Sequence, residues 1–234
     1  MQRSARSGFA RSTISGARLA EPVRLTEIDE TNVGDHSYLS ADDSCYFLFE
    51  YTSHRGYSFS ATNNLISNLK KKPSESNRPG YHYKGQAIAQ CAVHLRGAIH
   101  PDWLATATLV PAPPSKAIGH PDYDDRVERI CRLVSGNIDV RSIVQQVNST
   151  TAAHELGQGQ RPRIDDLVQN YRIAENLTLP APTAIAIVDD VLTNGTHFKA
   201  MHRVLSARYP QVPISGIFIA RRVFPEDENP FGEL

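Results

Sequence analysis

Two adjacent aspartates, Asp189 and Asp190, follow five apolar residues in the stretch AIAIVDDVLTNGTHF. If residues 184–188 form a buried strand, both carboxylates lie at its carboxyl end, where parallel α/β sheets bind ligands. Gly195 permits a tight turn, and the amides at the start of the next helix would favour an anion. Carboxylates suit vicinal hydroxyls and the loop suits a phosphate, so the pattern indicates a ribose 5-phosphate ligand.

A plain strand-to-helix connection is the structural alternative. With Thr196 as the N-cap, it would explain Gly195 and Thr196. It would leave the aspartates unexplained, because adjacent carboxylates repel each other and stabilise nothing by themselves. A phosphoacceptor site of a hydrolase or response-regulator-like protein would use the acids but not the Thr-Asn-Gly-Thr loop.

Strand patterns and helix patterns alternate along the chain. The expected strands are 45–51, 107–110, 184–188 and 214–220, and the expected helices are 62–72, 84–99, 123–134 and a segment around 198–205. The strands at 184–188 and 214–220 are apolar at nearly every position, as in parallel strands buried on both faces. We therefore expect a doubly wound α/β sheet.

The composition narrows the classes of function. Formal net charge is zero, so direct nucleic-acid binding of the usual basic kind is not expected. The three cysteines form no C-x-x-C pair, which argues against a zinc site or a disulfide framework and favours a cytoplasmic location. No apolar run is long enough for a membrane span.

The two ends differ from the middle. Residues 1–24 form an Arg/Ser-rich arm, 25–224 the expected domain, and 225–234 an acidic tail. The arm has the composition of a mobile segment, and an organellar transit peptide or a partner-binding arm is the alternative. A protein partner could bind through the arm or the tail, and a homo-oligomer is possible.

The stretch IVDDVLTNGTH resembles the 5-phosphoribosyl-1-pyrophosphate (PRPP) motif of type I phosphoribosyltransferases. LVPAPPSKAIGHPDYDDR and FEYTSHRGYSFSATNNLISNLKKK resemble segments of the competence-protein-F-like, or amidophosphoribosyltransferase-like, branch. The resemblance covers about residues 45–223 and implies a mainly parallel sheet with flanking helices and a small hood. The chain departs from the branch by lacking a cysteine-rich zinc ribbon and by carrying DYDDR in place of an Arg-Gly-Phe-Asn-Gln element.

The resemblance also implies roles for particular residues. Asp189 and Asp190 would be the catalytic pair, holding the ribose hydroxyls directly or through Mg²⁺. The implied PRPP-binding residues are Asp189, Asp190, Val191, Leu192, Thr193, Asn194, Gly195, Thr196 and His197. Those implied for the pyrophosphate are Pro114, Ser115 and Lys116, with Arg126 as a further cation. The loop 148–163 would be a lid carrying His154, Arg161 and Arg163.

Several of these residues have an ordinary interpretation as well. Arg126 could pair with Asp122 on an exposed helix face, which is the interpretation favoured here, and Lys116 could be a solvated loop lysine. His197 could be only a first-turn residue. The lysines at 70–72 resemble a solvated helix end.

Two functions remain open. The first is Mg²⁺-dependent phosphoribosyl transfer from PRPP to a nitrogenous base or amine. The second is a non-catalytic subunit that senses PRPP or a nucleoside monophosphate within a multiprotein assembly, of the competence or bacterial defence type.

Overall fold

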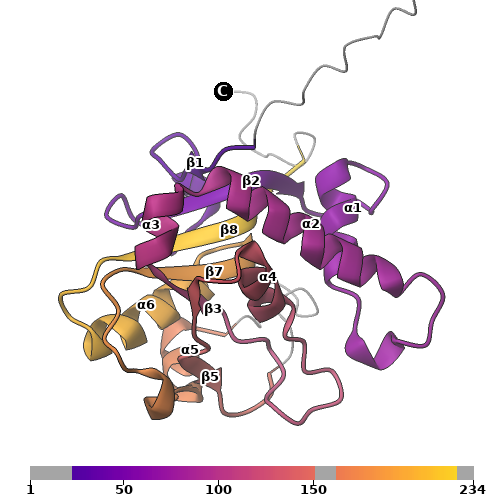
Figure 1. Ribbon diagram of the computed structural model, residues 1–234. Coiled ribbons are helices and arrows are strands. Elements are labelled where there is room, and N and C mark those ends of the chain that lie inside the picture. The colour runs from indigo at the N-terminus through magenta and orange to yellow at the C-terminus, as the bar shows by residue number, and fades with distance from the viewer. Residues whose placement is uncertain (1–22, 151–161, 226–234) are drawn as a thin grey trace, which may run out of the picture.

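A six-stranded sheet lies at the centre of the computed structural model, which describes residues 23–150 and 162–225 (Figure 1). The strand order is β1–β2–β8–β7–β3–β4, and only β1 is antiparallel to its neighbour. These strands are β1 (Thr26–Glu27), β2 (Cys45–Thr52), β3 (Thr108–Pro111), β4 (Asp139–Val140), β7 (Ile185–Leu192) and β8 (Ile214–Val223). A separate antiparallel pair consists of β5 (Val144–Gln146) and β6 (Tyr171–Ile173).

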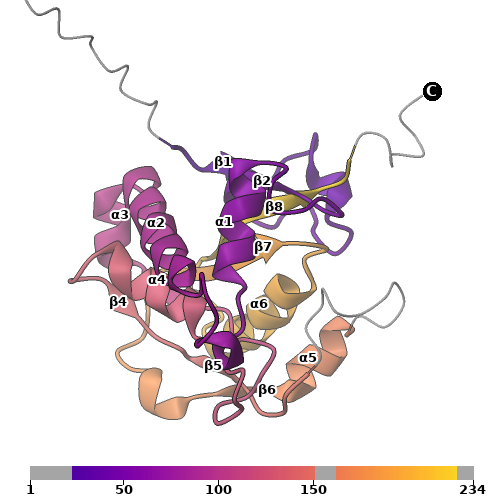
Figure 2. The ribbon, with the colours of Figure 1, turned by 90° about the vertical axis from the view of Figure 1, so that its right-hand side faces the viewer.

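Helices cover both faces of the sheet, as Figure 2 shows, with α2, α3 and α4 on one side and α5 and α6 on the other. The α-helices are α1 (Ala61–Leu69), α2 (His82–Ala98), α3 (Pro101–Thr106), α4 (Arg126–Val134), α5 (Ile164–Asn170) and α6 (Thr196–Arg208). Short 3-10 turns are at Val33–Asp35, Pro73–Glu75 and Glu175–Leu177. None of the helices in the described ranges is long and apolar enough to cross a membrane.

Strand β7 divides its side chains between two hydrophobic cores. Ala186 and Val188 pack with the apolar faces of α1 to α4. Ile185 and Ile187 pack with α5 and α6. This alternation is the period of a strand that is buried on both faces, and it explains why residues 185–188 are apolar at every position.

The parallel strands β3 and β7 are neighbours, but the strand that follows each of them in the sequence is added on opposite sides of this pair. From β3 the chain passes through α4 to β4 on one side, and from β7 it passes through α6 to β8 on the other. The carboxyl ends of β3 and β7 therefore flank a topological switch point, the usual place for a ligand in such sheets.

The structure confirms an α/β fold with a mostly parallel sheet between helices, and every expected strand and helix is present within a few residues. One difference matters for the site. β7 does not end at Val188 but continues through both aspartates, because β8 stays paired with it as far as Leu192. β3 stops at Pro111, opposite Val188, so beyond this point β7 is open on one side.

Candidate functional site

The two aspartates lie on opposite faces of the sheet. Asp189 pairs across the strands with Phe218 and, together with Phe218 and His197, lines a small hollow beside α6. Asp190 is buried on the other face, toward α1 and α4. Successive side chains of a strand point to opposite faces of the sheet, so the two carboxylates cannot both contact the same bound group from one side.

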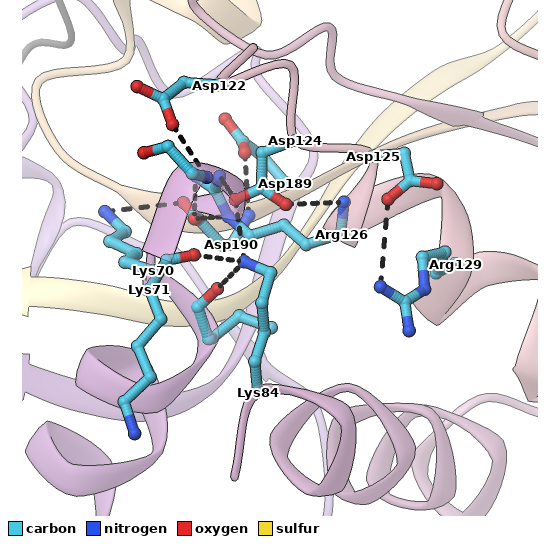
Figure 3. A network of polar contacts seen from close by, with 12 residues as sticks. Lys70, Lys71, Lys84, Asp122, Asp124, Asp125, Arg126, Arg129, Asp189 and Asp190 are labelled. Carbon is cyan, nitrogen blue, oxygen red and sulfur yellow. Dashed lines mark hydrogen bonds and ion pairs between the residues drawn. The ribbon is translucent and has the colours of Figure 1, made fainter. Parts of the chain in front are cut away.

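Asp190 belongs to a chain of ion pairs in which both carboxylates are buried (Figure 3). Its Oδ2 accepts from Nε of Arg126 at 2.8 Å and lies 2.7 Å from NH2 of the same guanidinium. Its Oδ1 lies 3.7 Å from Nζ of Lys70. NH1 of Arg126 donates to Oδ2 of Asp124 at 2.7 Å, and the same oxygen accepts from Nζ of Lys84 at 2.8 Å. This set of contacts, called here the ion chain, joins the end of α1 to α2, α4 and β7.

Lys84 is the innermost member of the ion chain, with only 2% of its side chain exposed. Besides Asp124, its ammonium donates to the carbonyls of Leu69 at 2.6 Å and Lys71 at 2.8 Å. All three donors are thus used, as a buried ammonium requires. Because these carbonyls flank residue 70, Lys84 also fixes the place from which Lys70 reaches Asp190.

The surroundings of the two acids drive their pKa values apart. Burial, and then the charge of Asp190, raises the pKa of Asp189 to about 7. Burial acts in the same sense on Asp190, but the charges of Lys70 and Arg126 outweigh burial and hold the pKa of Asp190 below its ordinary value. Asp190 is therefore a fixed anion, whereas Asp189 changes its charge near neutral pH.

The loop of residues 193–196, called here the phosphate loop after the ligand expected from the sequence, is fixed by hydrogen bonds to the carbonyls of its first two residues. His36 Nδ1 bonds to the carbonyl of Thr193, and the amide of Tyr38 donates to the carbonyl of Asn194 at 2.9 Å. Both peptide bonds are trans, so the amide on each points the opposite way. The N–H groups of Asn194 and Gly195 therefore face away from the 36–38 segment, and no described residue accepts a hydrogen bond from them.

The side-chain oxygen of Asn194 accepts hydrogen bonds from the two threonines of the phosphate loop. Oδ1 of Asn194 accepts from the hydroxyl of Thr196 at 2.8 Å, from its amide at 3.3 Å and from the hydroxyl of Thr193 at 3.3 Å. Thr196 is the first residue of α6 and not its N-cap, because Gly195 takes that position with φ of 88°. The left-handed backbone explains the glycine, and a Cβ here would lie 2.9 Å from Cδ2 of Leu39.

The loop after β3 is built on the same plan. The carbonyl of Ser115 accepts from the amide of Thr150 at 2.7 Å and also from Nε2 of Gln146. The amide of Lys116 therefore points away from Thr150. The ammonium of Lys116 donates to the carbonyl of Thr150 at 3.0 Å, so this lysine is not a free solvated side chain.

The hollows near the switch point differ in size. The hollow beside Asp189 and Thr196 holds only about 30 Å³. A cavity of about 260 Å³ lies behind the loop after β3, with Pro114, Asp124 and Glu128 among its lining residues. The hollow beside Asp189 is too small for a phosphate group, so a phosphate would bind on the outer surface of the loop or displace the Asn194 side chain.

The structure places the other predicted residues as follows. Val191 and Leu192 are buried in the two cores, and His197 packs near Asp189 with Nδ1 3.2 Å from the hydroxyl of Tyr171. Pro114 borders the larger cavity. Arg163 is exposed just before α5, and its amide donates to Asp166 at 3.0 Å. His154 and Arg161 lie outside the described residues, as do residues 1–22 and 226–234, which contain most of the predicted arm and tail.

Two expectations about basic residues were wrong. Arg126 pairs with Asp190 and Asp124, whereas Asp122 accepts from the amide of Ser74. Lys70 is not a solvated helix end, because α1 stops at Leu69 and Lys70 then turns toward Asp190. Attraction to a buried carboxylate, which the local sequence does not reveal, decides both positions.

Sequence reasoning missed His36, Lys84 and Asp124. Lys84 left a signal, since it lies four residues before Ile88 in the apolar stripe of α2 and so takes a core position. His36 left none, because its partner is 157 residues away. Asp124 could not be distinguished from its acidic neighbours Asp122 and Asp125.

The acid pair does not fit a magnesium ion held jointly by both carboxylates. The side chains lie on opposite sheet faces, and Asp190 already has two cationic partners. In the described part of the chain, no group of three or more His, Cys, Asp or Glu residues is placed to hold a metal ion. Mg²⁺ prefers an octahedral set of oxygens and gives up its water reluctantly, which this arrangement does not favour.

The fold and the site together define an α/β protein with a candidate anion-binding loop and a buried ion chain at the switch point of its sheet. Comparison with known proteins adds no closer class, because no protein-family model and no curated protein matches the chain.

Proposed function

We propose that the protein binds PRPP or a nucleoside monophosphate at the carboxyl end of β7, and that it transfers the phosphoribosyl group of PRPP to a nitrogenous base or amine with release of pyrophosphate. The observation that carries the proposal is the pair of loop carbonyls held by His36 and Tyr38. They leave the amides of Asn194 and Gly195 free at the start of α6, where the helix dipole also favours an anion.

The surrounding residues suit the rest of the ligand. Asp189 lies beside the phosphate loop, and its Oδ1 accepts from the amide of Asp190 at 2.7 Å. Its Oδ2 has no hydrogen-bond donor among the described residues, so this oxygen is left for a ribose hydroxyl. The free amide of Lys116 and the nearby ion chain lie at the neighbouring strand end, where a leaving pyrophosphate would need positive charge. This division gives Asp189 the contact with ligand and Asp190 a positioning role.

A non-catalytic sensor is the second candidate, and the Arg126–Asp190 contact favours it. The guanidinium occupies Asp190, and only a small hollow is open beside the phosphate loop. A protein that binds ligand without turning it over needs the phosphate loop but no freely available acid pair. Turnover of PRPP with a panel of bases and amines distinguishes the candidates, together with capture of a partner by the full chain but not by residues 25–224.

The binding proposal is tested with PRPP, ribose 5-phosphate and ribose by calorimetry. Phosphate-bearing ligands should bind the wild type clearly more tightly than ribose. Asn194→Asp should weaken their binding by about tenfold or more, because it puts an anion of the same shape among the loop donors. Asn64→Asp, on an exposed position of α1, adds the same charge elsewhere and should leave binding unchanged. Equal affinity for ribose and ribose 5-phosphate would sink the loop assignment.

A further inference from the structure

We propose that Arg126 and Lys70 are the permanent counter-cations of the aspartate pair, so that Asp189 and Asp190 hold no divalent metal ion of their own. These cations would balance the acids in the chain without bound ligand, whether or not the proposed function is correct. They replace the magnesium site that the sequence led us to expect.

The first support is the geometry at Asp190. Two nitrogens of Arg126 lie 2.8 and 2.7 Å from the same oxygen, and Nζ of Lys70 lies 3.7 Å from the other. Both oxygens of this carboxylate therefore face a positive charge. A metal ion bound to Asp190 would have to displace Arg126 or Lys70, or lie close to their positive charges.

The second support is that Arg126 is held in place from its other side. NH1 contacts Asp124 at 2.7 Å, and Asp124 is in turn anchored by the buried Lys84. To make way for a metal ion, the guanidinium would have to abandon two buried carboxylates. Separating a buried pair is strongly unfavourable, because it leaves charges without partners.

The third support is the balance of charge. Asp124, Asp189 and Asp190 carry three negative charges when ionised, and Lys70, Lys84 and Arg126 carry three positive charges. The cluster is therefore neutral when Asp189 is ionised and carries one net positive charge when Asp189 is protonated. A divalent cation would leave at least two positive charges in excess in a largely buried place.

The test uses the ligand-free full chain, titrated with MgCl₂ after removal of metal by EDTA and dialysis. Melting temperature and calorimetry should show no Mg²⁺ binding to the wild type. In Arg126→Met, where the acids lose their main counter-cation, Mg²⁺ should raise the melting temperature. The control is Arg132→Met, which removes a guanidinium from the same helix. Arg132 pairs with Glu128 and not with the aspartates, so the melting temperature of this variant should not respond to Mg²⁺.

The outcomes are decisive even if Arg126→Met fails to fold. Mn²⁺ added to the wild type should then leave the amide NMR signals of residues 188–192 unbroadened. The inference is overturned if Mn²⁺ broadens those signals, or if Mg²⁺ raises the melting temperature of the wild type and Asp189→Asn abolishes the rise. It is also overturned if Arg126→Met folds and Mg²⁺ leaves its melting temperature unchanged.

A ligand measurement separates this inference from the proposed function. Ribose 5-phosphate should bind the wild type equally well in EDTA and in Mg²⁺. Binding only in Mg²⁺ overturns the inference and leaves the proposed function standing. No binding in either condition sinks the proposed function, while the melting experiments still decide the question of the metal.

Discussion

Replacement of Asp189 by asparagine should alter how protein stability depends on pH. The carboxyl has a pKa of about 7 in the folded chain against an ordinary value of 3.8, because of burial first and the charge of Asp190 second. A group whose pKa rises on folding holds its proton more tightly in the folded state. The wild type therefore loses stability as the pH rises from 3.8, where the unfolded chain releases this proton, to about 7, where the folded chain releases it, and asparagine avoids the loss.

The magnitude follows from the size of the shift. With about 1.4 kcal/mol for each pKa unit, the full effect between about pH 5 and pH 8 would be about 2.5 kcal/mol. Asp189 is only half-buried, so solvent screening reduces the expected gain of Asp189→Asn over wild type to about 1–2 kcal/mol across this range. Urea unfolding of both proteins at several pH values measures this difference directly.

Asp190→Asn provides a control of opposite sign within the same pair. The pKa of Asp190 is lowered because Lys70 and Arg126 outweigh the effect of burial, so its ionisation stabilises the fold at neutral pH. Asp190→Asn should therefore be destabilised relative to wild type, and the deficit should shrink as the pH falls through the acidic range. If the difference between Asp189→Asn and wild type is the same at pH 5 and pH 8, the account of the pair is refuted.

Three further predictions concern residues around the site. Lys84→Met should lower the unfolding free energy by about 3–5 kcal/mol, measured by urea titration, because it leaves Asp124 and two carbonyls without their buried partner; a loss below about 1 kcal/mol would contradict the geometry. Gly195→Ala should cost about 1–3 kcal/mol by the same assay, since the residue has a left-handed backbone and its Cβ would press on Leu39. His36→Leu should weaken ribose 5-phosphate binding in calorimetry while His36→Asn, which can place a donor near the same carbonyl, retains more of it; equal affinities would show that the Thr193 contact does not orient the loop.

The four central strands of the sheet were predictable because their signals are local, whereas the two-residue edge strands β1 and β4 were not predicted. Apolar runs indicated β7 and β8, and stripes of period 3.6 indicated α2 and α4. The end of β7 was not predictable in the same way. Whether β7 stops at Val188 or includes the aspartates depends on how far its neighbouring strands extend. β3 pairs with β7 only as far as Val188, whereas β8 pairs with it as far as Leu192.

The candidate site was predictable only where it follows one continuous stretch. The loop and the acids at 189–196 are readable together because strand, turn and helix are adjacent in the sequence. The partners of the acids come from residues 70, 84, 124 and 126, and the support of the loop comes from 36–39. Which charged residue among several reaches a given carboxylate depends on tertiary packing, and no pattern in a single sequence records it.

The position of β8 has a consequence for how the chain can be made. Among the strands of residues 23–150 and 162–225 it comes last in the sequence, yet it lies between β2, one of the first, and β7. During synthesis, the edge of β2 that pairs with β8 stays unpaired until residues 214–223 have left the ribosome. Such distant pairing is slow to form and exposes strand edges meanwhile. A chain that stops before β8 would lack the middle of its sheet, so nascent and truncated forms should depend on chaperones more than the finished protein does.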